Sequence, residues 1–326
     1  MANRKPGSRC RSILLFVALS LPAAQAAHAN ELVRVGKAQG IAWTFLPADV
    51  GVAEGFFAEQ GLDVEITSLG GDAKVQQALA ARSIDFGLGS GPGMAFAAKG
   101  SPAIAVAAFA GSPRNISTIV LRDSPIKDIA DLKGKTIAVS TVGSLSEWLS
   151  KQMAIQEGWG PDGIHTVPLG AAESSLAALK AKQIDSLIIA TEVGLLLEEH
   201  GQGRIVTTMD RYAPHFITHV VFAQKPVVAS NPGLVQRFLK AFFGAIAFMK
   251  AHREETSAIA ERVLNQSPTV APKVYDLEIG MFSDDGRFDP QAVAVLKQSF
   301  VDMGTLQEKP TDDALFTTQF VPVKLP

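Results

Sequence analysis

The sequence predicts an α/β protein with two similar lobes, each a mostly parallel sheet covered by helices. Strand-like and helix-like segments alternate over the first two thirds of the chain, which is typical of βαβ units. An internal match supports two lobes: ALAARSIDFGLG (78–89) and ALKAKQIDSLII (178–189) both combine a helix end, a basic residue, Ile-Asp and a strand. The length of 326 residues is also enough for about two domains.

The first 29 residues differ from the rest and predict a secretory signal peptide. Four basic residues and no acidic residue precede an apolar run, ILLFVALSL (13–21), and small residues follow it. This three-part pattern favours cleavage after Ala29, with cleavage after Ala26 as the second choice. A membrane anchor is the weaker alternative, because so short a helix spans only about 14 Å of a bilayer core of about 30 Å.

Cleavage after Ala29 would leave an acidic chain without cysteine. The remaining 297 residues carry 26 Lys and Arg against 32 Asp and Glu, a formal net charge of −6. The single cysteine, Cys10, leaves with the signal, so thiolate chemistry and thiolate metal ligands are excluded. The charge balance gives no basic footprint for nucleic acid. The apolar stretch at 238–250 is too short to span a membrane and predicts a buried helix. We therefore expect an exported periplasmic protein.

In the first lobe, the expected strands are 32–38, 62–69, 84–90 and 102–111. Pro47 suits the first turn of the first helix, and Gly61 suits its end. Asp72 can cap the second helix. The last strand, PAIAVAAFAG, is apolar throughout, as expected for a strand buried on both faces.

In the second lobe, the expected strands are 135–140, 164–169, 184–190 and 204–209, with helices between them. The segment 215–224 predicts a strand that returns the chain to the first lobe. The last third predicts helices, because Asn231-Pro232 and Asp289-Pro290 each combine a cap with a first-turn proline.

The sequence contains no recognisable enzyme signature. It has no G-x-S-x-G, H-E-x-x-H or P-loop motif. The glycine-rich run at 89–93 lacks the spacing of a dinucleotide site, and its Pro92 removes a backbone donor. His215 and His219 share a face at a spacing of four, but no carboxylate lies near them in sequence, so a metal site is the weaker interpretation. We expect no metal and no other cofactor.

Gly, Ser and Thr gather at the carboxyl ends of the predicted strands, where parallel α/β sheets bind ligands. Glycine lets a ligand approach the backbone, hydroxyl groups add hydrogen bonds, and a helix beginning near 141–144 favours an anionic group. Trp43 could cover an apolar face of a ligand, and Glu192 could bind an amine or a ring N–H. The alternatives are ordinary turn and capping roles, with Trp43 folded onto its own lobe. The candidate ligand-binding residues are Trp43, Thr44, Gly70, Gly71, Ser90, Thr141, Gly143, Ser144, Thr191 and Glu192.

Three stretches carry a resemblance to a known family. They are WTFLPADVGVAEGFFAEQGLDVE (43–65), LGGDAKVQQALAARSIDFG (69–87) and DLKGKTIAVS (131–140). Together with the predicted signal peptide, they resemble the periplasmic solute-binding proteins of ABC transporters, of the nitrate, sulfonate and taurine and thiamine-pyrimidine-precursor type. The resemblance extends over nearly all of the mature chain, and the ten candidate residues occupy positions that match the family's binding loops.

The resemblance implies a type II periplasmic binding protein fold, with two doubly wound lobes joined by two crossing strands. The crossing strands would be 116–122 and 216–223. Lobe one would comprise 30–120 and 217–326, and lobe two would comprise 121–216.

The resemblance also implies a receptor, not an enzyme, that acts as a monomer. It would capture a small polar or anionic organic solute, of the sulfonate, nitrate or pyrimidine-like class, and deliver it to permease and ATPase subunits. Two departures bear on this function. The mature chain lacks the cysteines on which fungal pyrimidine synthases of this fold rely, and an acidic Glu192 puts nitrate or a simple sulfonate in doubt. The alternatives are an exported enzyme on the same fold and the ligand sensor of a membrane receptor.

Overall fold

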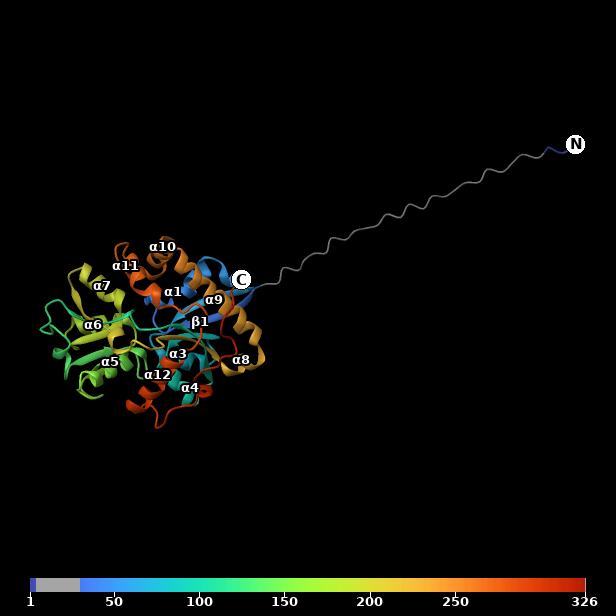
Figure 1. Cartoon of the computed structure of the whole chain (residues 1–326). Coiled ribbons are helices and arrows are strands. Elements are labelled where there is room, and N and C mark those ends of the chain that lie inside the picture. The colour runs from blue at the N-terminus through green and yellow to red at the C-terminus, as the bar shows by residue number, and fades with distance from the viewer. Residues whose placement is uncertain (4–29, 326) are drawn as a thin grey trace.

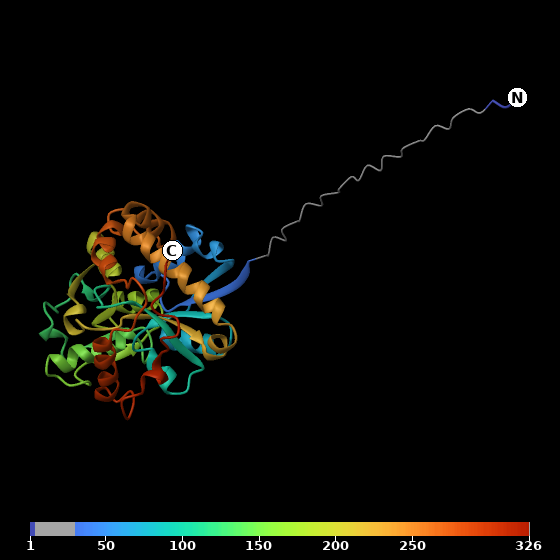
Figure 2. The same ribbon diagram turned by 45° about the vertical axis from the view of Figure 1, so that its right-hand side comes forward.

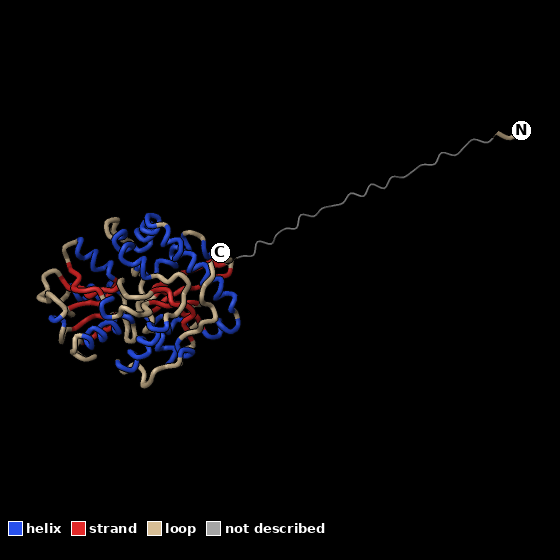
Figure 3. Tube along the Cα trace, in the orientation of Figure 1, coloured by secondary structure: helices blue, strands red, loops and turns tan. Residues whose placement is uncertain are grey.

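The structure is a computed structural model that describes residues 1–3 and 30–325, so the expected signal peptide lies outside the described residues apart from its first three. The chain forms two α/β lobes that lie side by side (Figure 1). Each lobe contains a five-stranded sheet, with the orders β2-β1-β3-β10-β4 and β7-β6-β8-β5-β9. Figure 3 shows the two sheets with loops between them. The predicted two-lobed α/β architecture is therefore confirmed.

The first sheet contains four strands from the N-terminal part of the chain and one that returns later. β1 pairs in parallel with β2 and β3, whereas β10 pairs antiparallel with β3 and β4. β4 is buried at every position, as its apolar sequence predicts. The strands are β1 (Glu31–Lys37), β2 (Leu62–Ser68), β3 (Phe86–Ser90), β4 (Ala103–Ala110) and β10 (His219–Gln224). The helices and turns between them are η1 (Trp43–Phe45), α1 (Leu46–Ala53), α2 (Phe56–Glu59), α3 (Asp72–Ala80) and α4 (Met94–Ala98).

The second sheet repeats this arrangement. β6 pairs in parallel with β7 and β8, and β5 pairs antiparallel with β8 and β9. The strands are β5 (Ile116–Leu121), β6 (Thr136–Val139), β7 (His165–Pro168), β8 (Ser186–Ala190) and β9 (Gly203–Thr208). The helices are η2 (Ala130–Leu132), α5 (Leu145–Gln156), α6 (Ala172–Lys180) and α7 (Thr191–Glu199), followed by η3 (Asp210–Tyr212).

The internal sequence match marks equivalent places in the two lobes. It covers the end of α3 with β3 in one lobe, and the end of α6 with β8 in the other. Arg82 and Lys182 end the two helices with the same left-handed φ of 58°. Asp85 accepts a hydrogen bond from the backbone N–H of Arg34, and Asp185 accepts one from Thr136, at 2.8 and 2.9 Å. Each Ile-Asp pair therefore fixes its strand against the strand beside it.

The two expected crossing strands need correction. Residues 116–121 form β5, which lies wholly in the second sheet, and β10 lies wholly in the first. The chain crosses between the lobes in the segments 111–115 and 209–218. It therefore enters the second lobe before residue 116, and not after residue 120 as the expected lobe boundary has it. The apolar sequence of β5 is explained by burial within the second sheet.

The C-terminal third is mainly helical, as predicted. Its helices pack on the first lobe, and α12 lies close to the second lobe (Figure 1, Figure 2). Asn231 and Asp289 cap their helices, with oxygen acceptors 3.2 and 2.8 Å from the N–H groups of Leu234 and Ala292. None of the helices in residues 30–325 has the length and apolarity needed to cross a membrane. The elements are α8 (Lys225–Ser230), α9 (Pro232–Ala251), α10 (Arg253–Leu264), α11 (Ala271–Glu278), η4 (Ile279–Met281), α12 (Pro290–Asp302) and α13 (Asp312–Leu315).

Candidate ligand-binding site

A cavity lies between the two lobes, beyond the carboxyl ends of β1, β3, β6 and β8. The volume of this cavity is about 50 Å³. The side chain of Gln39 spans the lobes beside it and donates a hydrogen bond to the carbonyl of Gly170 at 3.3 Å. Polar residues of both lobes and of the first crossing segment form part of its wall, and they are Gln39, Asp72, Ser90, Asn115, Ser140, Ser146, Ser175 and His219.

Asp72 is the acidic group of this wall. It begins α3, and its Oδ1 accepts a hydrogen bond from the backbone N–H of Ser90 at 2.6 Å. The predicted capping role is wrong, because Gly71 is the N-cap residue and no side chain caps the helix. Burial raises the pKa of Asp72, and the hydrogen bonds from Ser90 oppose that rise.

His219 reaches the cavity from the antiparallel strand β10. Its ring lies against Phe45 and Phe109, with centroid distances of 4.8 and 5.7 Å. Burial lowers the pKa of His219 to about 3, so the imidazole is neutral at ordinary pH. His215, the other member of the candidate metal pair, is exposed. Residues 30–325 contain no group of three or more His, Cys, Asp or Glu side chains able to hold a metal ion.

Ser90 is the candidate residue that lines the cavity. The other nine candidates lie outside the wall of the cavity. Most of them contact protein groups at the interface between the two lobes. Gly71 faces the side chain of Thr141 in the opposite lobe, and a Cβ atom at Gly71 would lie 2.4 Å from its Cγ2. Gly70 lies beside the backbone of Gly170 and Ala171, also across the interface.

The start of α5 uses its polar groups internally. Ser144 is the N-cap residue, and the N–H of Glu147 donates to its hydroxyl at 3.4 Å. The N–H of Thr141 donates to the same hydroxyl at 3.4 Å, and the N–H of Gly143 donates to the carboxylate of Glu147 at 2.5 Å. The N–H of Ser140 donates to a second hydroxyl, that of Ser146, at 2.9 Å. Ser144 therefore caps α5, which was the alternative to a ligand-binding role.

A network of buried side chains joins the lobes next to the cavity. Asn115, in the first crossing segment, donates to the hydroxyl of Thr44 at 2.5 Å, and Thr44 donates to Glu278 of α11 at 3.1 Å. From the other lobe, Glu192 accepts a hydrogen bond from the backbone N–H of Trp43 at 2.6 Å. Thr191 beside it bonds the hydroxyl of Ser117 at 2.7 Å and holds the start of α7 to β5.

Glu192 and Glu278 form a buried carboxyl pair. Their exposed fractions are 5% and 0%. Burial raises the pKa of Glu192 to about 7, and burial together with the charge of Glu192 raises that of Glu278 well above its usual range. Glu192 Oε2 and Glu278 Oε1 have no donor among the described residues, and two carboxyl groups can bond to each other only by sharing a proton. The pair therefore holds a proton at neutral pH.

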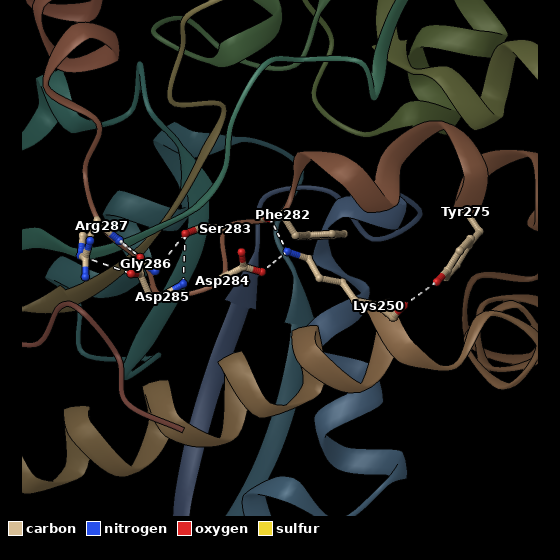
Figure 4. Close-up of polar contacts among 8 residues, drawn as sticks. All are labelled: Lys250, Tyr275, Phe282, Ser283, Asp284, Asp285, Gly286 and Arg287. Atoms are coloured by element: carbon tan, nitrogen blue, oxygen red, sulfur yellow. Dashed lines mark hydrogen bonds and ion pairs between the residues drawn. The ribbon is translucent and has the colours of Figure 1, made fainter. Parts of the chain in front are cut away.

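Trp43 is folded onto its own lobe, which was the alternative to a ligand-covering role. Its ring lies 5.9 Å from Tyr275 and 5.6 Å from Phe282. Figure 4 shows how those two rings are held. Lys250 donates to the carbonyl of Phe282 at 2.8 Å and pairs with Asp284, and the carbonyl of Lys250 accepts a hydrogen bond from the hydroxyl of Tyr275 at 3.4 Å. The same hydroxyl donates to the carbonyl of Met249 at 2.8 Å.

Trp148 of α5 makes a further contact between the lobes. Its indole N–H donates to the hydroxyl of Ser299 in α12 at 2.7 Å, and its ring stacks on Phe216 of the second crossing segment at 4.1 Å. The helical spacing of Trp148 predicts only a core position, so sequence reasoning gives no signal for this contact.

Most of the cavity's polar wall is likewise missed by sequence reasoning. Gln39 and Ser140 stand in the strand-end loops that predict a site, and these loops are the signal that could have found them. Asn115 has a weaker signal, as a polar residue between two apolar strands at the change of lobe. Ser146 and Ser175 lie inside helices, where no local pattern distinguishes them from surface serines.

Comparisons with known proteins agree with this architecture. A family model described as NMT1/THI5-like matches residues 44–256. A binding protein of Brucella abortus (strain 2308) is 26% identical over 254 residues, which cover 77% of each chain. A formylaminopyrimidine-binding protein of Halalkalibacterium halodurans is 23% identical over 231 residues, or 70% of this chain and 69% of the relative.

Two solved structures show the range of proteins with this fold. The alkanesulfonate-binding protein SsuA of Xanthomonas axonopodis pv. citri, bound to MOPS, has a TM-score of 0.74 at 17% identity and covers 87% of this chain and 96% of its own. The desulfurization enzyme DSZB has a TM-score of 0.61 at 18% identity, and the match covers 89% of this chain and 97% of the enzyme. The predicted periplasmic binding protein fold is thus confirmed. The match of the family model over most of the chain shows that the protein belongs to the NMT1/THI5-like family.

Proposed function

We propose that this protein is the periplasmic substrate-binding component of an ABC importer. The observation that carries the proposal is a cavity walled by polar groups from both lobes, at the place where two backbone segments of residues 30–325 connect them. A ligand in such a cavity touches both lobes only when they are closed, so its binding shifts the population toward the closed shape. The closed shape is what a permease can distinguish from the empty receptor.

The class of ligand follows from the cavity and from the relatives. Hydroxyl, amide and carboxyl groups in the wall suit a small polar organic solute. The relatives named above bind a formylaminopyrimidine or an alkanesulfonate, which are solutes of this size class. Export to the periplasm rests on the signal-peptide pattern of residues 1–29, and the partners would be the permease and ATPase subunits of the importer. We propose that the receptor acts as a monomer.

An exported enzyme on the same fold is the second candidate, because DSZB shares the architecture. Both candidates meet the same experiment. The mature protein is purified natively from the periplasm, and the small molecule that it retains is identified by mass spectrometry. A receptor returns this molecule unchanged, and adding it at 100 times its Kd raises the free energy of unfolding by about 2.7 kcal/mol. Conversion of the molecule into a product during incubation would instead support the enzyme.

A further inference from the structure

The carboxyl pair of Glu192 and Glu278 joins one lobe to the other. Glu192 lies in the first turn of α7, in the second lobe. Glu278 ends α11, which packs against α10, and α10 packs against α1 of the first lobe. Trp43 and Thr44, which each donate to one of these carboxyl groups, also belong to the first lobe. The pair therefore exists only while the lobes are in contact.

Each carboxyl group of the pair has one oxygen that no other donor reaches. Glu192 Oε2 and Glu278 Oε1 are buried and have no donor among the described residues, while the two side chains are hydrogen-bonded to each other. If both groups were ionised, two negative charges would lie side by side out of water. A proton between them removes this repulsion and supplies the missing donor.

No ion pair within residues 30–325 compensates for a second negative charge on Glu192 or Glu278. η1, β5 and β8, which pack around the pair, contain no titratable side chain. Tyr275 of α11 donates its hydroxyl to the carbonyl of Met249. The charged side chains of the other surrounding elements are exposed or partly exposed, and they are Arg114, Glu198, Glu199, Arg204, Arg253, Glu254, Glu255, Glu261, Arg262, Lys273 and Asp276.

We propose that closure of the lobes is linked to a proton: the pair takes one up from solvent when Glu192 and Glu278 meet, and loses it when the lobes separate. Separated carboxyl groups lie in water, where they are ionised at neutral pH. The inference rests on the proposed function and adds a second input to the closure that a ligand drives. Such a receptor holds its ligand more tightly in an acidic medium and releases it more readily as pH rises.

The direction of the effect follows from the burial of the pair. In the closed chain burial raises the pKa of Glu192 to about 7, whereas a separated carboxyl group keeps the ordinary value of 4.5. Between these values the closed form binds more protons than the open form, so closure weakens as pH rises. One proton changes the closure equilibrium by up to about tenfold for each pH unit. The raised pKa of Glu278 extends the loss to higher pH.

Single-molecule energy transfer between dyes on the two lobes tests the link. The chain from residue 30 onward contains no cysteine, so Ala81→Cys and Ala181→Cys provide the attachment sites. They are exposed positions at the ends of α3 and α6, in opposite lobes. We expect the ratio of closed to open molecules to fall about tenfold or more from pH 5 to pH 8.

A ratio that stays constant or rises with pH, or a single population at every pH, overturns the inference. The proposed function is tested separately by the small molecule that the natively purified protein retains. Retention of that molecule with pH-independent closure would leave the receptor and remove the proton link, so the two failures are distinguishable.

A double variant assigns the effect to the pair. Glu192→Gln with Glu278→Gln cannot ionise, keeps acceptors for Trp43 and Thr44, and allows the two amides to bond to each other. We expect the same closed-to-open ratio at pH 5 and pH 8. The control, Glu173→Gln with Glu255→Gln, removes one exposed carboxylate from each lobe and should retain the fall. A fall of wild-type size in the first double variant overturns the assignment. If that variant does not fold, the pH series on the unsubstituted pair decides alone.

Discussion

Replacing Glu192 by glutamine should change how the stability of this protein depends on pH. In the folded chain burial raises the pKa of Glu192 from 4.5 to about 7. The unfolded chain therefore loses this proton near pH 4.5, whereas the folded chain keeps it until about pH 7. Between those values the folded state holds more protons, so the free energy of unfolding decreases as pH rises, and the decrease is complete above pH 7.

The size of the effect follows from the shift. At about 1.4 kcal/mol for each pKa unit, Glu192 reduces stability by about 3 kcal/mol at pH 8 relative to pH 4. Glu192→Gln cannot ionise, keeps an oxygen acceptor for the N–H of Trp43, and can donate to Glu278. We expect the variant to be more stable than the wild type at pH 8 by up to about 3 kcal/mol, or about 6 °C in Tm, and nearly equal to it at pH 5.

Differential scanning calorimetry at pH 5, 6.5 and 8 measures this difference. Glu59→Gln, at an exposed position of α2, is the matched control and should follow the wild-type curve. If the Tm of Glu192→Gln runs parallel to that of the wild type across this range, the carboxyl pair does not hold a proton and the reasoning is refuted.

Three further substitutions test contacts described above. Trp148→Phe removes the hydrogen bond to Ser299 and should cost about 1–2 kcal/mol, seen as a Tm lower by about 2–4 °C; an unchanged Tm would show that this contact between lobes contributes nothing. Gly71→Ala places a methyl group 2.4 Å from Thr141 Cγ2 at a φ of 132°, so small-angle X-ray scattering should show a larger radius of gyration; a curve identical to the wild type's would contradict the close approach. Asn231→Ala removes the cap of α9 and should cost about 1 kcal/mol in thermal unfolding, whereas a loss near zero would mean that the cap is replaced by solvent.

The fold was largely predictable from local patterns because those patterns repeat. The Ile-Asp match identified two equivalent helix–strand junctions, and in the structure Asp85 and Asp185 make the same kind of backbone contact. The return of the chain to the first lobe was also predicted, and β10 lies in the first sheet. The placement of β5 was harder to predict, because it is an apolar segment and an apolar sequence does not state which sheet covers it.

The site was less predictable, because it depends on how the two lobes meet. The loops at the strand ends contribute Gln39, Ser90 and Ser140 to the cavity wall, and Ser90 is the candidate residue among them. Residues such as Thr44 and Glu192 found partners that are 234 and 149 positions away in sequence, and those contacts occupy the groups that a ligand would have used. No local sequence pattern indicates such long-range contacts, or the burial that lowers the pKa of His219.

The two crossing segments determine how the lobes can move. β4 and β10 are neighbours in one sheet, β5 and β9 are neighbours in the other, and the segments between them therefore run side by side. Backbone hydrogen bonds join them near both ends, from Thr218 to Ala110 and from Met209 to Ile116, each at 2.9 Å. In the proposed receptor, opening of the lobes would bend this joined pair of segments, and a ligand that needs a wider cavity would enter and leave along that motion.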